Sequence, residues 1–372
     1  MSKPYGIIIL GANGSGKSTL GRELTRVLNF AHFDAENYYW HKTDMPFTVA
    51  RSHKERKDIL LSDIEKHDSY VMSGDVSNWG EQFLSLFDLV VFLIVPADIR
   101  IERIKKREYE RFGDRIRKGG DMYEQHLKFV EFAASRDIAL IEHWALLYSC
   151  PILRVDGTKT LKENIDEILT YINTRNHYDA LIDEINDPVR DPVPLKAYMD
   201  KWDGEAFIEV LRLSPDKSVL EVGVGTGRLA VRVCGKCGRF TGIDISPKII
   251  ERAKENLRDF DNASLVYGNF LTYSFNERFD TIYSSLTFMH IQNKRAAIQR
   301  AANLLNPSGR FVLSIDKNQQ TEIDYASRYG SRKIAVYSDT AEEITALITE
   351  AGLNIEKQFE TEFAVIFAAK KG

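Results

Sequence analysis

A run of nine residues near the start, GANGSGKST from Gly11 to Thr19, matches the GxxxxGK[ST] pattern of a phosphate-binding loop. It follows an apolar stretch typical of a buried strand and precedes a helical pattern, the context in which backbone N–H groups surround phosphate oxygens. Lys17 would neutralise the β- and γ-phosphates, and Ser18 would ligate Mg²⁺. We therefore predict an ATP site formed by Gly11, Asn13, Gly14, Ser15, Gly16, Lys17, Ser18 and Thr19.

An acidic residue, Asp34 in AHFDAENYYW, follows the second predicted strand. A carboxylate at this point can ligate Mg²⁺ through water or accept a proton from an acceptor hydroxyl. It can equally cap the N-terminus of a helix, and the sequence leaves both interpretations open. Lys17 and Asp34 are thus candidate catalytic residues, and Ser18 and Asp34 are candidate Mg²⁺ ligands. The GTPase base-recognition pattern NKxD is absent, which disfavours a GTPase.

A basic strip extends from Arg100 to Lys118, with nine basic and four acidic residues. Arg103, Arg107 and Arg111 recur every four residues, so on a helix they share one face. Arg115 follows a Phe-Gly break. Guanidinium groups leading into a glycine-flanked loop are typical of a lid that closes over phosphates. The alternative is a solvated helix with interspersed glutamates; we predict a lid, with Arg107, Arg111 and Arg115 as its candidate residues.

A second glycine-rich loop, EVGVGTGR, begins at Glu221 and has glycines at positions 223, 225 and 227. This GxGxG spacing differs from the GxGxxG of dinucleotide binders, which indicates a ligand without a pyrophosphate. Glu221 at the strand end would receive an ammonium group, directly or through water. Asp244 in GIDIS ends the next strand, where a carboxylate accepts both hydroxyls of a ribose. A ribose without phosphate plus an amino-acid end describes S-adenosylmethionine (SAM).

The second half of the chain resembles the class I SAM-dependent methyltransferases through VLEVGVGTGR, GIDIS, YGNF, FDTIYSSLTFMHI and LLNPSGRFVLSID, in that order. The resemblance implies that Asn269 and Phe270 flank the adenine and that Ser284 and Ser285 line the methionine end. Many members carry Asp where Asn269 stands, so we expect somewhat weaker binding. The implied SAM residues are Glu221, Gly223, Gly225, Gly227, Asp244, Ile245, Asn269, Phe270, Ser284 and Ser285.

Two further features accompany these motifs. The lead-in YMDKWDG resembles the N-terminal cap that some of these enzymes fold over SAM, with Tyr198, Met199 and Trp202 as the cap residues; the alternative is an aromatic helix that packs in the core. His290 follows the fourth strand of this half, close to where the methyl group would leave, and is a candidate general base. A lone histidine is also a common structural residue, and methyl transfer needs mainly in-line positioning.

The first 175 residues resemble small P-loop kinases of the adenylate, shikimate and gluconate kinase group, including proteins described as AAA family ATPases. The motifs are GANGSGKST, FDAENYYW, SGDVSNWG and FLIVPADIRIERIKKREYERFG. The resemblance implies Mg-ATP, a lid arginine and an acceptor site near the phosphate loop, with Asp75 as a weaker acceptor-site candidate. It also places DGTKT at 156–160 near the adenine base. The phosphoryl acceptor does not follow from it.

Alternating strand and helix patterns occupy both halves, so we predict an α/β fold with two doubly wound three-layer domains, the first P-loop kinase-like and the second a Rossmann-like methyltransferase. The predicted domains are 1–176 and 201–372, joined by a linker and cap lead-in at 177–200. The proline-rich stretch NDPVRDPVPL lies within that linker. The predicted helices of the first half are 50–66, 98–111, 121–138 and 160–174, and the last two apolar runs predict an antiparallel hairpin.

Composition and charge exclude several classes of protein. Residues 1–175 carry 25 basic and 26 acidic side chains, and residues 176–372 carry 25 and 28, so the charge balance argues against a nucleic-acid partner. The start, MSKPYGIIIL, is too short an apolar run for a signal peptide or a membrane span, so we expect a cytoplasmic protein without a membrane partner. The pair in CGKC is interpreted as two reduced thiols.

These features together predict a bifunctional transferase that uses ATP, Mg²⁺ and SAM. One half would phosphorylate a small molecule or nucleotide, and the other would methylate a small-molecule acceptor. Two alternatives remain: a methyltransferase with an ATP-sensing regulatory domain, or a kinase and methyltransferase that modify RNA. The acceptors and the oligomeric state do not follow from the sequence.

Overall fold

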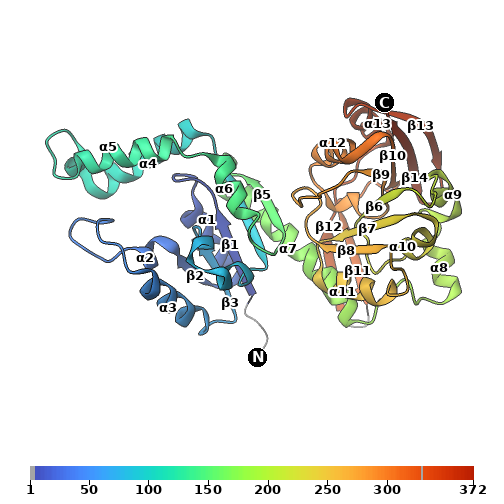
Figure 1. Ribbon diagram of the computed structural model, residues 1–372, viewed down its shortest axis with the longest axis horizontal. Coiled ribbons are helices and arrows are strands. Elements are labelled where there is room, and N and C mark those ends of the chain that lie inside the picture. The colour runs from blue at the N-terminus through green and yellow to red at the C-terminus, as the bar shows by residue number, and fades with distance from the viewer. Residues whose placement is uncertain (1–4, 328–329) are drawn as a thin grey trace. The chain divides into compact units, whose positions relative to one another are not determined.

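The computed structural model describes residues 5–327 and 330–372 and divides the chain into two compact units, 1–169 and 170–372 (Figure 1). The first four residues, which begin the stretch predicted to be too short for a signal peptide, lie outside the described residues. Helix α7 (Leu161–Asp183) contributes to both units. The division after Leu169 precedes the predicted boundary because the last turns of α7 pack on the second unit.

The first unit is built around a parallel sheet of five strands in the order β2-β3-β1-β4-β5. This order makes β1, which leads into the phosphate loop, the central strand. The strands are β1 (Tyr5–Leu10), β2 (Ala31–Asp34), β3 (Ser69–Ser73), β4 (Leu89–Ile94) and β5 (Ile152–Asp156). The helices are α1 (Lys17–Leu28), α2 (Ala35–Tyr39), α3 (His53–Ile64), α4 (Ala97–Phe112), α5 (Tyr123–Ala134) and α6 (Ile138–Ala145), with the 3₁₀ turns η1 (Ser77–Trp79), η2 (Glu81–Ser85) and η3 (Gly113–Ile116).

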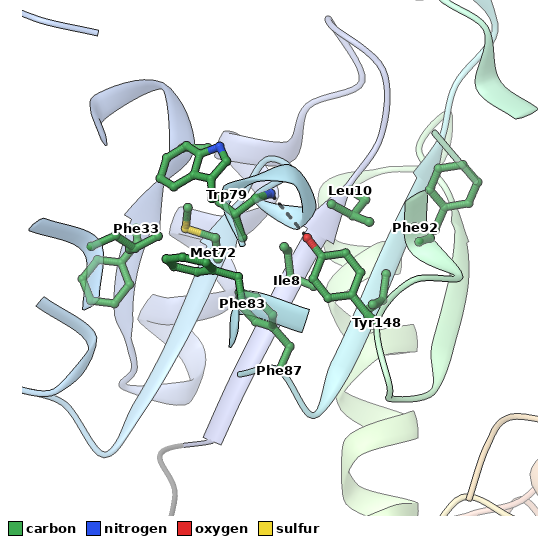
Figure 2. Packing of buried hydrophobic residues seen from close by; sticks show 14 of the residues in the cluster. Ile8, Leu10, Phe33, Met72, Trp79, Phe83, Phe87, Phe92 and Tyr148 are labelled. Carbon is green, nitrogen blue, oxygen red and sulfur yellow. Dashed lines mark hydrogen bonds between the residues drawn. The ribbon is translucent and has the colours of Figure 1, made fainter. Parts of the chain in front are cut away.

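One face of this sheet packs on a buried hydrophobic cluster that includes Ile8, Met72 and Phe92 (Figure 2). Alternate residues of β1, β3 and β4 point into the cluster, as the period of two along a strand requires. Helices α3 and α6 close it with residues such as Leu60 and Ile141. The helix predicted over 121–138 is α5, which ends at Ala134, and a separate helix, α6, begins at Ile138 because Asp137 caps it by accepting from the backbone of Ala139.

The second unit contains a sheet of seven strands in the order β13-β14-β10-β9-β6-β7-β8. Five neighbouring strands run parallel to one another: β10, β9, β6, β7 and β8. Strand β14 pairs antiparallel with both β10 and β13, which confirms the predicted closing hairpin. The strands are β6 (Ser218–Val222), β7 (Arg239–Asp244), β8 (Ala263–Tyr267), β9 (Phe279–Ser284), β10 (Leu305–Asp316), β13 (Leu353–Glu360) and β14 (Ala364–Lys371).

Helices cover both faces of this sheet, giving the predicted three layers with a Rossmann-like arrangement. Helices α12 (Lys294–Leu304) and α13 (Ala341–Glu350) pack on one face, and α9 (Gly204–Val210), α10 (Ala230–Val233) and α11 (Pro247–Asn256) on the other. A separate hairpin of β11 (Glu322–Ser327) and β12 (Gly330–Ala335) was not predicted. The 3₁₀ turns are η4 (Cys234–Lys236) and η5 (Phe288–His290).

The proline-rich stretch is not wholly irregular. Helix α8 (Val193–Met199) begins inside it, since proline is tolerated in the first turn of a helix, where its missing N–H group would have no partner. Asp187 in the same stretch is buried and accepts hydrogen bonds from the Asn256 amide of α11. The predicted linker of 177–200 therefore contains the end of α7, a packed segment and a short helix.

Candidate cofactor sites

The predicted phosphate-binding loop connects the end of β1 to the first turn of α1. Gly11, Gly14 and Gly16 have positive φ angles of 153°, 82° and 101°, and a Cβ at Gly14 would lie 2.5 Å from the Arg100 carbonyl oxygen. Lys17 Nζ donates to the carbonyl oxygens of Gly11 and Ala12 at 2.9 and 3.2 Å. The Ser15 hydroxyl is buried and has no hydrogen-bond partner among the described residues. A glycine cradle with a lysine and an orphaned hydroxyl fits a polyphosphate.

Charged side chains surround Lys17. Burial lowers the pKa of Lys17, the carboxylates of Glu36 and Asp34 oppose that effect, and the guanidinium groups of Arg107 and Arg136 add to it. All five side chains thus interact electrostatically at one place. Burial likewise raises the pKa of Glu36, which also interacts with Arg111. The guanidinium of Arg107 also donates to the Glu108 carboxylate at 3.0 Å. The roles predicted for Lys17, Asp34, Arg107 and Arg111 stay predictions. Glu36 lies within the FDAENYYW motif but was not selected, and Arg136 lies outside every motif.

Asp34 ends β2 and caps α2, because its carboxylate accepts from the Glu36 N–H at 3.1 Å. The helix-cap interpretation thus holds locally, and the Mg²⁺ role stays a prediction. Ser18 lies in the first turn of α1, next to Lys17. Within the described ranges, the structure contains no group of three His, Cys, Asp or Glu side chains arranged for a metal ion.

Two arginines of the basic strip form hydrogen bonds to backbone carbonyl oxygens. Arg100 is buried and donates to the carbonyl oxygens of Val95, Asn13 and Ala133. Arg103 donates to the carbonyl oxygens of Ser15 and Gly157, so it joins the phosphate loop to DGTKT. These two arginines are therefore structural and not a free basic surface.

Two residues predicted to act at the site, Arg115 and Asp75, use their side chains in contacts within the first unit. Arg115, a lid candidate, forms an exposed ion pair with Asp121 at 2.7 Å, so its guanidinium is committed within the loop after α4. Asp75, the weaker acceptor-site candidate, accepts from the Ser77 and Tyr148 hydroxyls, both at 2.9 Å. Its oxygens thus hold the segment after β3 in place.

The second glycine loop lies between β6 and α10. Gly223, Gly225 and Gly227 have φ angles of 76°, 54° and 99°, the left-handed region that glycine adopts readily. A Cβ at Gly223 would lie 1.9 Å from Thr287 Oγ1, whereas a Cβ at Gly225 would meet no atom within 4 Å. The open space at Gly225 is a cradle that fits a ligand lying against the loop.

Asp244 ends β7 and faces this loop, as predicted. Its carboxylate accepts from the backbone N–H groups of Gly225 and Ser246 at 3.2 and 3.0 Å. Burial raises the pKa of Asp244 to about 6, and hydrogen bonds from the Ser246, Gly225 and Ile245 backbone oppose this rise. The Ile245 backbone thus binds Asp244, and the predicted contact of Ile245 with SAM stays a prediction. Asp244 presents a carboxylate beside an open cradle, which suits a ribose.

Glu221 is buried, and its Oε2 accepts from the Tyr283 hydroxyl at 2.8 Å. Burial raises its pKa to about 8, so the side chain is protonated at neutral pH. This hydrogen bond directs one carboxyl oxygen at Tyr283, and the predicted contact with an ammonium group, directly or through water, stays a prediction.

The raised pKa of Glu221 predicts a pH dependence of stability. The folded chain retains a proton that the unfolded chain, with the usual pKa of 4.5, releases before the pH reaches 8, so folding stability falls as the pH rises through this window. Glu221→Gln should remove this loss, worth about 2 kcal/mol between about pH 6.5 and 8. Thermal unfolding of both proteins across this range measures it, and parallel profiles would contradict it.

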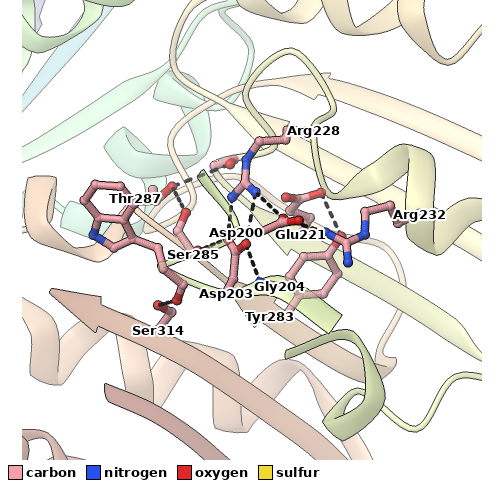
Figure 3. A network of polar contacts seen from close by, with 12 residues as sticks. Asp200, Asp203, Gly204, Glu221, Arg228, Arg232, Tyr283, Ser285, Thr287 and Ser314 are labelled. Carbon is pink, nitrogen blue, oxygen red and sulfur yellow. Dashed lines mark hydrogen bonds and ion pairs between the residues drawn. The ribbon is translucent and has the colours of Figure 1, made fainter. Parts of the chain in front are cut away.

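The cap segment is tied to the glycine loop by ion pairs (Figure 3). Arg228 of the loop donates to Asp203 at 3.0 Å, and Arg232 donates to Asp200 at 3.0 Å. Asp203 also accepts from the Ser285 hydroxyl at 2.8 Å, so one buried carboxylate joins the cap, the loop and the end of β9. Asp203 and Arg228 are thus site residues that the motifs contained but the sequence analysis did not select.

The cap aromatics form a cluster of their own. Tyr198 and Trp202 pack edge to face, and both contact Phe363 in the turn between β13 and β14. Met199 ends α8 beside them. The Trp202 Nε1 is buried without a partner, although Tyr198 is half exposed. The segment packs on aromatic residues, as the second interpretation predicts, and it also borders the glycine loop. Its role as a cap over SAM stays a prediction.

Three implied SAM residues have side chains committed to the protein interior. Phe270 is buried in the hydrophobic core near Phe275. The Ser284 hydroxyl donates to the Val222 carbonyl oxygen at 2.8 Å. Asn269 accepts from the backbone of Leu271 at 3.0 Å, which shapes the turn after β8. These contacts show how the fold uses the three side chains, and the implied contacts with SAM stay predictions.

His290, the candidate base, is in η5 after β9. Its Nε2 lies 2.8 Å from the Tyr178 hydroxyl of α7, and burial lowers its pKa to about 4. The ring is neutral at pH 7, but a group with such a low pKa is a weak base. A structural role with Tyr178 accounts for this geometry, and proton transfer by His290 stays a prediction.

Comparison with known proteins gives a family for each unit. Residues 213–352 match the family described as "Methyltransferase domain", and residues 7–123 match "AAA domain". The chain is 40% identical over 176 residues to "Uncharacterized protein YqaC" of Bacillus subtilis, covering 45% of this chain and 97% of that protein. It is 31% identical over 175 residues to an "Uncharacterized methyltransferase" of Anoxybacillus flavithermus, covering 46% of this chain and 81% of that protein.

A solved structure, the "DhpI-SAH complex", is 18% identical with a TM-score of 0.46 and covers 55% of this chain and 97% of its own. Among the described residues, no helix is both long and apolar enough to cross a membrane.

Proposed function

The chain belongs to the families of the uncharacterized methyltransferase of Anoxybacillus flavithermus and of Bacillus subtilis YqaC, and on this premise we propose that it is a bifunctional enzyme. The second unit is a SAM-dependent methyltransferase. We propose that it methylates a small molecule, and that the first unit phosphorylates a small molecule or nucleotide with Mg-ATP.

The methyltransferase proposal is carried by the position of Asp244 against the glycine loop. Its carboxylate already accepts from Gly225 N–H, at the point where the loop leaves open space. Asp244 would hold the ribose, and the loop backbone would lie against the methionine part. SAM supplies an electrophilic methyl group, and the protein positions the acceptor in line with it.

The kinase proposal is carried by the charges around Lys17. Lys17 would hold the terminal phosphates, and Arg107, Arg111 and Arg136 would neutralise charge that develops on the transferred group. Ser18 would hold Mg²⁺ together with Asp34, through water. Asp34 or Glu36 would accept the proton of the acceptor hydroxyl.

A second candidate function is an ATP-sensing regulatory role for the first unit. The observation that favours it is that α7 is one helix whose first turns belong to the first unit and whose last turns belong to the second. The test incubates the protein with a pool of small metabolites, γ-labelled ATP and methyl-labelled SAM. Phosphoryl label in a metabolite supports the kinase, whereas slow hydrolysis without an acceptor and a changed SAM affinity with ATP support the regulator.

Asp244→Asn is expected to weaken SAM binding by about 10- to 100-fold, because a charged hydrogen-bond acceptor for the ribose becomes a neutral one. Calorimetric titration with SAM measures the change. The variant should keep the ATP-dependent activity of the first unit, and unchanged SAM affinity would contradict the assignment of Asp244. Asp259→Asn, an exposed aspartate after α11, is the matched control.

A further inference from the structure

The last two turns of α7 lie against the loop that follows β7. The Asp179 carboxylate accepts from the Ser246 hydroxyl at 2.6 Å and from the Lys248 N–H at 3.3 Å. Ser246 in turn donates its backbone N–H to Asp244. Asp179 and the preceding residue, Tyr178, both belong to the second unit.

Tyr178 precedes Asp179 on α7, and its side chain contacts His290, which follows β9. Its hydroxyl is 2.8 Å from Nε2 of His290, and the two rings pack edge to face with centroids 5.5 Å apart. Burial raises the pKa of the Tyr178 hydroxyl, and the charge of Asp244 raises it further. The hydroxyl thus contacts the histidine after β9, and Tyr178 is the neighbour along α7 of Asp179, which binds the loop that follows Asp244.

We propose that the end of α7 forms a wall of the SAM site, in which Tyr178 contacts the ribose held by Asp244 and Asp179 positions the loop that carries Asp244. This deepens the proposed methyltransferase function and rests on it. A ribose at Asp244 would lie between the carboxylate and the tyrosine, so the phenol would both donate a hydrogen bond and exclude water. Asp179 is a positioning residue, since its contacts are to Ser246 and Lys248.

The test measures binding of S-adenosylhomocysteine and 5′-methylthioadenosine to the full chain by calorimetry. Both probes carry the ribose, and only the first carries the amino-acid end. Tyr178→Phe keeps the ring and removes the hydroxyl, so we expect both probes to bind about tenfold more weakly. Asp183→Asn, on the next turn of α7, is the matched control. Its pair with Lys248 is exposed, and binding should be unchanged.

A double-mutant cycle separates contact with the ribose from a structural role. If Tyr178 and Asp244 hold the same group, Tyr178→Phe should cost much less affinity in the Asp244→Asn background than in the wild type. A merely structural tyrosine would give additive losses, and additivity or an unchanged affinity for Tyr178→Phe would overturn the inference.

A second variant covers the case in which Tyr178→Phe does not fold. Asp179→Asn should then weaken both probes by a similar factor, and unchanged binding would overturn the inference. Failure of the proposed function gives a different result, because the wild-type chain itself would then bind neither probe.

Discussion

Lys17→Ala is expected to lower phosphoryl transfer from ATP by about 100- to 1,000-fold, the loss typical when one preorganised group that stabilises transition-state charge is removed. Lys17 lies partly buried in the glycine cradle, and its ammonium group donates to two loop carbonyl oxygens. With the nucleotide bound, those donors would turn to the phosphates. Release of labelled phosphate and its transfer to metabolites measure the effect.

Lys66→Ala is the matched control for this variant. Lys66 is an exposed lysine that pairs with Asp63 near the end of α3, so its removal should leave ATP chemistry unchanged. S-adenosylhomocysteine affinity should be the same in the wild type and in Lys17→Ala when no ATP is present. Full phosphoryl transfer by Lys17→Ala would contradict the kinase proposal. A loss of ATP-dependent change in SAM affinity, without lost transfer, would favour the regulator.

Gly223→Ala is expected to destabilise the second unit by about 3 kcal/mol or more, from a left-handed backbone and an overpacked contact together. The backbone at Gly223 has a φ of 76°. The added Cβ would overlap Thr287, whose Oγ1 would be 1.9 Å away. Either the loop or the segment after β9 must move, so binding of S-adenosylhomocysteine should be lost as well. Urea unfolding and calorimetry measure the two effects.

Gly225→Ala provides the comparison within the same loop. Its φ of 54° carries a similar backbone cost, but its Cβ meets nothing within 4 Å. We expect a loss of stability of only about 1–2 kcal/mol, together with weakened cofactor binding, because the methyl group fills the cradle. Equal destabilisation by the two variants would contradict the steric argument at Gly223.

The residues that sequence reasoning placed correctly share a physical basis. The loops at Gly11 and Gly223 follow apolar strands, and their glycines are required by positive φ angles and close packing. Asp244 is predictable because the end of a parallel strand next to the loop has few alternative positions. In such cases the local pattern and the fold determine the same placement.

The residues that were missed depend on long-range packing. The sequence pattern predicts a helix that ends at residue 174, yet α7 continues to Asp183 because its polar residues find partners on the second unit. Arg332 binds Glu184 just beyond the helix, and Asp179 binds Ser246. No apolar period marks such a segment. Arg136 is a single charge outside any motif, so only the fold brings it to Lys17.

No pattern in the sequence indicated that the side chains of Ser284 and Phe270 contact the protein interior. Motif position places a residue near a site, but side-chain direction depends on which face of the sheet or turn it occupies. Ser284 bonds the neighbouring strand, and Phe270 enters the core. The sequence therefore predicts the position of these residues in the fold better than the direction of their side chains.

The continuity of α7 bears on how such two-part chains can be recombined. A hybrid protein that borrows only the residues after the proline-rich stretch would leave Tyr178 and Asp179 behind. It would put foreign side chains against Ser246 and His290, where two close hydrogen-bond contacts now exist. A transferable methyltransferase module therefore has to start no later than about Thr170, inside the helix, where the compact second unit begins.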